Sequence, residues 1–170
     1  MLPARPVVRV LAMEIERSFI ADVPLEKAWT VLGDNFHDVA AWSSGIKVSR
    51  RLSGVGPAGV ADRQCEVPGF GTITERLGTF DAQSRTFAYE VIEGAPGFAT
   101  HMGNRWRLEP AGVGKTRISF KIRTELKPVA GFLMGWMLKR QMNKLCDEVC
   151  DDLKVFLETG KPSQSKLKAA

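Results

Sequence analysis

Three side chains of this sequence could carry acid–base chemistry, and each falls on the apolar face of an expected β-strand. Arg63 and Glu75 alternate in step with hydrophobic neighbours in two successive strands, so both are expected to point inward. Because a buried charge normally needs a partner, the two could pair inside the fold. Tyr89 is the only tyrosine and could donate a hydrogen bond or act as a general acid. These three residues are the catalytic candidates.

Each candidate also has a plainer interpretation. The charges of Arg63 and Glu75 could bind a ligand carbonyl or carboxylate, or they could form a structural ion pair. Tyr89 could be a core aromatic residue with a satisfied hydroxyl group. The structural interpretation is the commoner one for all three. His101 falls on the opposite, basic strand face, where we expect an exposed side chain and neither a catalytic base nor a metal ligand.

The inward positions of the expected strands are mostly apolar, which suits a hydrophobic ligand held by a few polar groups. Thr100 and Asn104 lie between apolar neighbours and could meet a ligand or a buried water. Trp106 and Trp136 could wall the same space, or pack in the core. The predicted ligand-binding residues are Arg63, Glu75, Phe87, Tyr89, Thr100, Met102, Asn104, Trp106, Phe120, Met134 and Leu138.

The sequence predicts neither a metal nor a cofactor. Cys146 and Cys150 lie four residues apart, as two metal ligands on one helical face would, but neither His37 nor His101 is near them in sequence. The chain has no phosphate-binding Gly-Lys-Ser/Thr motif, no dinucleotide fingerprint and no Gly-x-Ser-x-Gly elbow. It also lacks the cysteine and histidine spacing of an iron–sulfur site.

One long amphipathic helix, predicted over residues 128–159, must position the strands that carry these side chains. Pro128 suits its first turn, and Gly160 is typical of a helix end. Gly131 and Gly135 predict a bend or a close ligand approach in its first third. Its apolar stripe has steps of three and four residues and consists of Leu138, Met142, Leu145, Val149, Leu153 and Phe156.

The rest of the chain mainly shows the two-residue period of β-strands. Two short helices, at 25–32 and 35–42, follow the first strand. Short turns between the later strands imply antiparallel pairing. The sequence therefore predicts an α+β fold, in which a curved antiparallel sheet of about seven strands wraps round the C-terminal helix. The expected strands are 14–20, 46–52, 60–67, 72–80, 86–92, 98–108 and 117–123.

A length of 170 residues fits one domain, predicted at 13–160 between an N-terminal extension, 1–12, and a polar basic tail, 161–170. Three of the five net positive charges are tail lysines, and the tail is expected to fray. The remaining body carries about +2, too little to predict a nucleic-acid partner. The chain has three cysteines and no secretion signal, which predicts a cytoplasmic protein. It contains no apolar run long enough to span a membrane, so no integral membrane segment is expected.

Particular residues then resemble a known family. The segment 21–42 resembles one that places an aromatic residue in the first helix, then a Gly-Asp-Phe element and a second tryptophan, which here are Trp29, Gly33, Asp34 with Phe36 after an inserted Asn35, and Trp42. The run Thr74-Glu75-Arg76-Leu77 followed by Asp81, and the strand end at Trp106, Glu109 and Pro110, are similar too. The chain thus resembles the START-like (SRPBCC, helix-grip) superfamily, in particular its polyketide cyclase/dehydrase and lipid-transport family, over roughly residues 13–159.

The resemblance implies an internal cavity between the sheet and the C-terminal helix, with loops 67–71 and 94–98 beside its mouth. Members of the superfamily include lipid carriers, hormone receptors and aromatase/cyclases, so the fold does not select a function. We expect a protein that binds a hydrophobic small molecule or lipid in this cavity. The alternative is a polyketide cyclase/dehydrase-type enzyme that uses the polar cavity residues as acid and base. A third possibility uses the basic outer sheet face on an acidic partner or membrane surface. The oligomeric state stays open.

Overall fold

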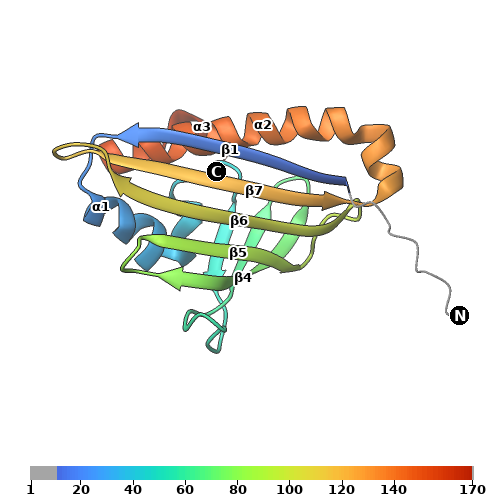
Figure 1. Cartoon of the computed structure of the whole chain (residues 1–170), viewed down its shortest axis with the longest axis horizontal. Coiled ribbons are helices and arrows are strands. Elements are labelled where there is room, and N and C mark those ends of the chain that lie inside the picture. Colours follow the sequence, from blue (N-terminus) through green and yellow to red (C-terminus); the bar gives the residue numbers. More distant parts are fainter. Residues whose placement is uncertain (1–10, 170) are drawn as a thin grey trace, which may run out of the picture.

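The computed structural model describes residues 11–169, although not the side chains at 11 and 129–132. Seven strands form one curved antiparallel sheet in the order β1-β7-β6-β5-β4-β3-β2 (Figure 1). This confirms the predicted architecture. The strands are β1 (Leu11–Ala21), β2 (Val48–Arg51), β3 (Arg63–Val67), β4 (Gly71–Asp81), β5 (Thr86–Glu93), β6 (Ala99–Pro110) and β7 (Thr116–Leu126).

The strand bounds differ from the expected ones mainly at the ends of the sheet. Strand β1 begins at Leu11, two residues inside the predicted extension, because it pairs with β7 along its whole length, from Leu11 with Leu126 to Ala21 with Thr116. The rest of that extension lies outside the described residues. Strands β2 and β3 are shorter than expected, since the glycine-rich stretch between them forms a loop.

Helix α2 (Pro128–Thr159) begins and ends where the sequence predicts. Pro128 occupies its first turn, and Gly160 adopts a left-handed conformation at φ 71°, from which its N–H donates to the carbonyl of Phe156. Figure 1 shows α2 lying along β1 and bending near its N-terminal end. Towards its C-terminal end Leu153 and Leu157 are fully buried in the core. In its middle Met142, Leu145 and Val149 are only half-buried because they line a cavity.

The two short helices predicted after β1 are confirmed, although the first one changes its winding. Helix α1 (Leu25–Trp29) continues directly into a π-helical turn, η1 (Thr30–Asp34), and a 3-10 helix, η2 (Phe36–Ala41), follows. Position 33, inside the π-helical turn, requires glycine, because a Cβ atom there would come within 2.5 Å of the Trp29 ring. Phe36, the first residue of η2, presents its carbonyl to Arg63 of β3.

The C-terminal tail is more ordered than its polar composition suggests. Residues Gln164–Ala169 form a short helix, α3, and Lys166 is buried although a loose tail was expected. Its Nζ donates to the carbonyl of Ile46 at 2.7 Å. The buried carboxylate of Asp152 in α2 accepts hydrogen bonds from Ser163 Oγ and from the backbone N–H of Ser44. The tail therefore holds the loop 43–46, between η2 and β2, against α2.

Candidate functional site

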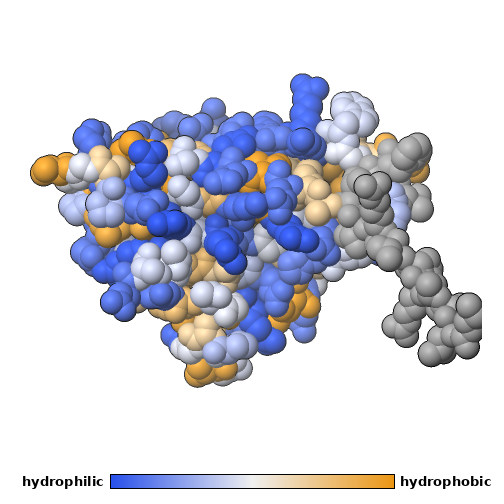
Figure 2. Space-filling view, in the orientation of Figure 1, coloured by the Kyte–Doolittle hydropathy of each residue, from blue (hydrophilic) through white to orange (hydrophobic). Residues whose placement is uncertain are grey.

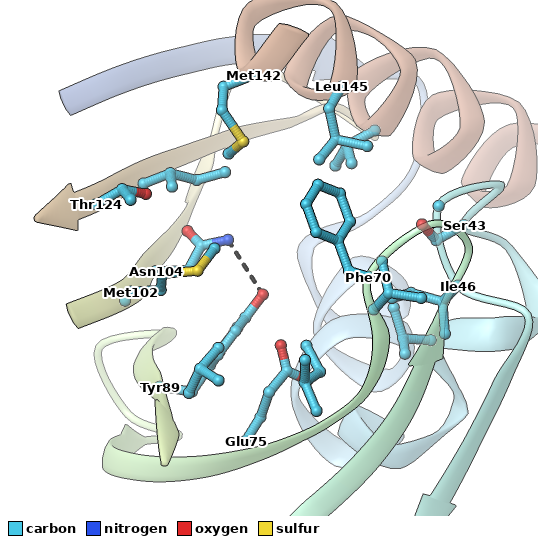
Figure 3. Close-up of a pocket in the computed structure, with 18 of the residues that line it drawn as sticks. Ser43, Ile46, Phe70, Glu75, Tyr89, Met102, Asn104, Thr124, Met142 and Leu145 are labelled. Atoms are coloured by element: carbon cyan, nitrogen blue, oxygen red, sulfur yellow. Dashed lines mark hydrogen bonds between the residues drawn. The ribbon is translucent and has the colours of Figure 1, made fainter. Parts of the chain in front are cut away.

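A cavity of about 190 Å³ lies between the sheet and the middle of α2 (Figure 3). Strands β3 to β7 supply one wall and α2 the other, and the loop 43–46 closes one side. Most lining side chains are apolar. The polar side chains and the residues that oppose them from the helix and loops are Ser43, Arg63, Glu75, Tyr89, Asn104, Trp106, Thr124, Leu138, Met142, Leu145 and Val149.

The charged part of the lining is an ion pair across neighbouring strands. Arg63 and Glu75 lie directly opposite each other in the β3–β4 register, and their exposed fractions are only 4% and 6%. Arg63 donates to Glu75 Oε2 from Nε at 2.8 Å, and its Nη2 lies 2.7 Å from the same oxygen. The prediction that these two side chains point inward and pair is confirmed. Two nitrogens of the arginine thus contact one carboxylate oxygen, and these charge-assisted contacts compensate part of the cost of burying both charges.

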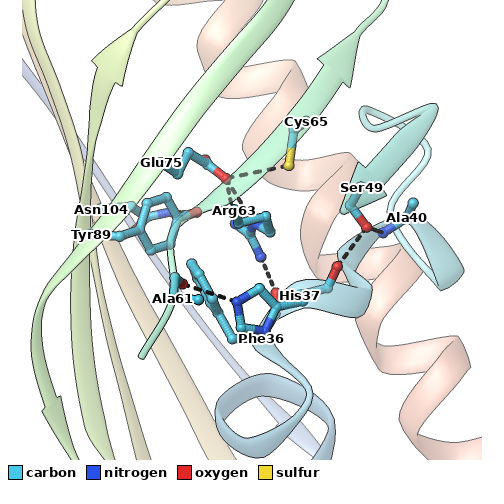
Figure 4. Close-up of polar contacts among 10 residues, drawn as sticks. All are labelled: Phe36, His37, Ala40, Ser49, Ala61, Arg63, Cys65, Glu75, Tyr89 and Asn104. Carbon is cyan, nitrogen blue, oxygen red and sulfur yellow. Dashed lines mark hydrogen bonds and ion pairs between the residues drawn. The ribbon is translucent and has the colours of Figure 1, made fainter. Parts of the chain in front are cut away.

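Three further contacts hold the guanidinium in place (Figure 4). Its Nη1 donates to the carbonyl oxygen of Phe36 in η2. Its central carbon lies 3.8 Å from the centroid of the Phe36 ring and 5.3 Å from that of Tyr89. Burial is the largest single influence and acts to lower the pKa of Arg63, but the charge and hydrogen bond of Glu75 together with Tyr89 and Cys65 outweigh it, so the pKa is raised overall. Arg63 is therefore a fixed cation that joins η2 to the sheet.

Cys65 lies next to this pair and is a weak donor to it. Its Sγ is 3.4 Å from Glu75 Oε2, the oxygen that already accepts from Arg63. Burial raises the pKa of the Cys65 thiol to about 12, and the nearby charge of Arg63 only partly opposes this. The thiol therefore stays protonated at neutral pH and is a poor nucleophile.

Tyr89 and Asn104 form the second polar group of the cavity. They are paired in the β5–β6 register, and Asn104 Nδ2 donates to the Tyr89 hydroxyl oxygen at 3.1 Å (Figure 3). Burial, reinforced by the negative charge of Glu75, raises the pKa of Tyr89 to about 12. The phenol is therefore neutral at physiological pH, so it can donate a hydrogen bond but does not act as a base.

Three buried polar atoms of the lining have no hydrogen-bond partner among the residues that the structure describes. They are Asn104 Oδ1, Trp106 Nε1 and Thr124 Oγ1. Asn104 and Thr124 belong to the neighbouring strands β6 and β7, and Trp106 follows Asn104 on the same face of β6. An unsatisfied buried polar atom is costly, and native structures contain few of them. The cavity therefore offers one strong acceptor and two donors to whatever occupies it.

Most of the predicted ligand-binding residues reach this cavity. Stacked rings keep part of its wall rigid, since Trp106 and Phe120 lie 4.6 Å apart with an interplanar angle of 30°. The predicted residues that line it are Arg63, Glu75, Tyr89, Met102, Asn104, Trp106, Phe120 and Leu138.

Three predicted residues lie elsewhere. Thr100 is exposed, and its hydroxyl donates to the carbonyl of Glu125, because a bulge between Ala99 and His101 interrupts the alternation of β6. Phe87 packs in the core behind the cavity, stacked on Trp106 at 6.0 Å. Met134 is exposed on α2, and so is Trp136. The expectation that Thr100, Phe87 and Met134 would face the cavity is therefore wrong. Trp136, expected to wall the cavity or to pack in the core, does neither.

The sequence did not indicate several lining residues, because they come from irregular segments. Val39 and Trp42 belong to η2 and its end, and Ser43 and Ile46 to the loop that the tail holds in place. No alternation exists there to tell inside from outside. Thr124 could have been found, since it shares its strand face with Phe120 and Ile122.

The two loops expected beside the mouth meet over the cavity. Phe70, from the β3–β4 turn, and Phe98, at the start of β6, have ring centroids 6.4 Å apart in an edge-on arrangement. Both line the cavity, together with Val67 and Pro96 of the same loops. The aromatic contact therefore covers one end of the cavity.

The basic outer face of the sheet is mostly neutralised by its own carboxylates. Lys121 pairs with Glu14 at 2.7 Å, and Arg123 with Glu125 at 2.8 Å. Arg107 pairs with Glu109 at 2.8 Å. Figure 2 shows this side of the molecule as mainly hydrophilic. It is therefore a solvated face of mixed charge.

Two negative observations apply to residues 11–169. No helix in that range is both long and apolar enough to span a membrane. No three of its histidine, cysteine, aspartate and glutamate side chains cluster as ligands of a metal ion would.

Solved structures with the same fold are known at low sequence identity. A START superfamily protein from Mycobacterium smegmatis is 15% identical, with a TM-score of 0.69 over 85% of this chain and 96% of its own. A protein from Nitrosospira multiformis is 22% identical, with a TM-score of 0.68 over 87% and 98%. Norcoclaurine synthase from Thalictrum flavum, solved with dopamine and hydroxybenzaldehyde, is 16% identical, with a TM-score of 0.65 over 92% and 94%.

No curated protein matches the chain. The sequence model of one family, described as polyketide cyclase/dehydrase and lipid transport, matches residues 12–158, which is most of the chain and all seven strands except the first residue of β1. The helix-grip architecture described above agrees with this match. The chain belongs to the polyketide cyclase/dehydrase and lipid transport family.

Proposed function

We propose that the protein binds one small, mainly apolar molecule in the cavity, with a neutral polar group of that molecule directed at Asn104. The observation that carries this proposal is the position of the unpartnered Asn104 Oδ1, Trp106 Nε1 and Thr124 Oγ1 in an otherwise apolar lining. An apolar enclosure with a few convergent polar groups is the usual form of a small-molecule site. Family membership supports the same reading.

The cavity volume favours a small molecule over a lipid. An apolar cavity of ~150 Å³ accommodates one benzene-sized molecule, whereas sites for drug-sized ligands span ~300–1,000 Å³. At about 190 Å³ the cavity is closer to the first case. A ligand with one or two rings fits this volume. A larger ligand would require the contact between Phe70 and Phe98 to open.

The polar end of the ligand should be uncharged. Arg63 is already neutralised by Glu75, so neither side chain offers a free charge to an ionic ligand. A hydroxyl or a carboxamide can both accept from Trp106 or Thr124 and donate to Asn104, which an ionised carboxylate cannot do. We therefore infer a phenol, alcohol or amide as the ligand class.

Native mass spectrometry of protein purified from its own cells tests this proposal. We expect a bound species whose released mass corresponds to a small neutral compound. The Asn104→Leu variant should lose it, because the polar group would then be buried without its partner. Thr100→Val is the matched control, since Thr100 lies on the same strand outside the cavity. Recovery of unliganded protein only, with no binding of phenols, alcohols or amides in calorimetry, would refute the proposal.

An enzyme of the cyclase/dehydrase type is the second candidate, supported by the side chains at the cavity wall. All described hydrogen bonds to the Glu75 carboxylate go to Oε2, and Tyr89 is a neutral donor nearby. Glu75 would then move a proton while Tyr89 stabilises a developing oxyanion. Norcoclaurine synthase shares the fold, which supports this candidate by analogy alone.

Glu75→Gln separates the two candidates, because it keeps the shape and removes the acid. If the protein is an enzyme, the wild type converts a polyketide-like substrate and the variant still binds it but is slower by about a hundredfold or more. If it only binds, the compound is recovered unaltered from both proteins.

We also infer a cytoplasmic location, supported by the three cysteines, none of which forms a disulfide.

A further inference from the structure

The outward side of the first half of α2 carries large apolar side chains in water. Leu133, Trp136 and Met137 are all exposed, and the exposed fraction of Trp136 is 73%. Arg140 and Lys144 are exposed as well. Steps of three, four, seven and eleven residues from Leu133 place the five side chains on one face of the helix. We call this face the outer α2 stripe.

The same part of the helix already has a packed apolar side. Leu138 and Met142 point the other way and line the cavity. Residues 133–138 are thus apolar nearly all round the helix, a pattern that normally indicates burial on every side. Isolated exposed apolar residues need no explanation, but several on one helix face mark an interaction site.

The charges around the stripe have one sign. From Lys127 to Cys146 the sequence contains four basic residues and neither aspartate nor glutamate. Lys127, Lys139 and Arg140 form no ion pair with any residue in the described part of the chain, whereas Lys144 lies 3.6 Å from Glu148. This differs from the outer sheet face, where carboxylates neutralise most of the bases. The stripe is therefore complementary to a negatively charged, partly apolar surface.

We propose that the outer α2 stripe docks the protein on a lipid bilayer with anionic headgroups. A helix face that combines Trp and Leu with flanking Lys and Arg is suited to the boundary between headgroups and acyl chains, where the indole and the long basic side chains each reach both environments. Leu138, which follows Met137, lines the cavity, so docking brings that end of the cavity close to the bilayer.

Other occupants fit the charge pattern less well. A second copy of this chain would bring the same face against itself by two-fold symmetry, so Arg140 and Lys139 would meet like charges. Residues 1–10 of the chain contain Arg5 and Arg9 and no acidic residue, so they carry the same sign. An acidic protein would satisfy the charges, but the convex face of a single helix offers it no groove.

Trp136 itself reports on the docking, because the other three tryptophans, Trp29, Trp42 and Trp106, are buried. Vesicles of phosphatidylcholine, with or without phosphatidylglycerol, are added to the full-length protein. We expect the emission to shift to the blue with the anionic vesicles only, and the protein to pellet with them. High salt should weaken both signals, since the attraction between lysine or arginine and the surface is screened.

Variants assign the signals to the stripe. Trp136→Phe should still pellet but lose the blue shift. Lys139→Glu combined with Arg140→Glu should bind anionic vesicles about tenfold or more weakly. Arg105→Glu combined with Arg117→Glu makes the same change of net charge on the outer sheet face and should bind like the wild type.

Three outcomes would overturn the proposal. The first is that the wild type neither shifts nor pellets with the anionic vesicles. The second is that the outer sheet variant loses binding as much as the α2 variant does, which would assign the effect to overall charge. The third is a concentration-dependent dimer in light scattering that Leu133→Asp abolishes, which would assign the stripe to a second copy.

Discussion

Glu75 compensates a guanidinium that is almost completely removed from water, so its loss should be severe. Glu75→Ala leaves Arg63 buried with only the Phe36 carbonyl and two ring faces as partners. We expect the free energy of unfolding to fall by about 3–5 kcal/mol. Urea denaturation measures this directly.

The exposed pair of Arg107 and Glu109 supplies the control for that measurement. Glu109→Ala also removes the carboxylate of a 2.8 Å pair, but in water. It should cost about 1 kcal/mol or less. Similar losses in the two variants would show that the pair of Arg63 and Glu75 gains nothing from its burial.

Tyr89 and Cys65 should make the protein sensitive to alkaline pH. Mainly through burial, folding raises the pKa of Tyr89 from 10.0 to about 12 and that of Cys65 from 9.0 to about 12. The unfolded chain therefore loses these protons first. The stability that they contribute is fully present below about pH 9 and is lost as the pH rises towards 12.

The denaturation midpoint, measured at a series of alkaline pH values, tests this expectation. Tyr89→Phe keeps the ring and removes the ionising group, so its midpoint should fall less steeply than that of the wild type between pH 10 and 12. Equal slopes would mean that the Tyr89 hydroxyl ionises as easily in the folded protein as in the unfolded chain.

Strand alternation predicted the side chains of the site only where each strand keeps its alternation on the cavity side. Arg63 and Glu75 were found because each shares its face with apolar neighbours in the regular β3–β4 register, although the pairing of β4 with β5 shifts beside Glu75. Thr100 was misplaced because one bulge reverses the alternation, and the sequence around it contains no signal for a bulge. The Phe36 carbonyl could not be predicted, because a backbone group has no residue type to recognise.

At the scale of the elements, the apolar stripe of α2 serves two different environments. Leu153 is fully buried in the core, whereas Leu145 is half-buried and faces the cavity. Leu153→Ala leaves a void among packed side chains and should cost about 2–5 kcal/mol. Leu145→Ala only enlarges an existing cavity, so its cost should lie near or below the lower end of that range.

Thermal and urea unfolding of the two variants give the comparison, with Asp151→Ala, at an exposed position of the same helix, as a control for helix propensity. A larger loss for Leu145 than for Leu153 would mean that the middle of α2 packs tightly against the sheet and that the cavity is closed in solution.

The elements themselves were largely predictable because their signals are local. The helical period, Pro128 and Gly160 define α2, and a two-residue period defines each long strand. The π-helical turn η1 was not predicted, because Gly33 packs on the Trp29 ring and that ring in turn packs against Phe80 and Phe87, which lie far away in the sequence.

At the scale of the whole molecule, the first strand and the C-terminal tail both connect α2 to the rest of the fold. Strand β1 pairs with β7, and β7 leads into α2. The tail then returns from the end of α2 to the loop 43–46, which no local pattern indicates. The composition of 161–170 suggested a solvated tail, because the partners of its polar side chains lie far away in the sequence, at Asp152 and Ile46.

This connection predicts that the tail controls the shape of the cavity from outside it. Ser163→Ala removes the hydroxyl that donates to the buried Asp152 carboxylate, while the backbone N–H of Ser44 remains its donor. We expect a loss of about 1–3 kcal/mol in the free energy of unfolding. We also expect faster hydrogen exchange at the amides of Ser44 and Ile46, because the loop is released locally before the protein unfolds. Lys168→Ala, in the exposed part of α3, should change neither quantity. If Ser163→Ala lowers stability but leaves exchange in the loop 43–46 unchanged, the tail stabilises α2 alone and has no influence on the cavity wall.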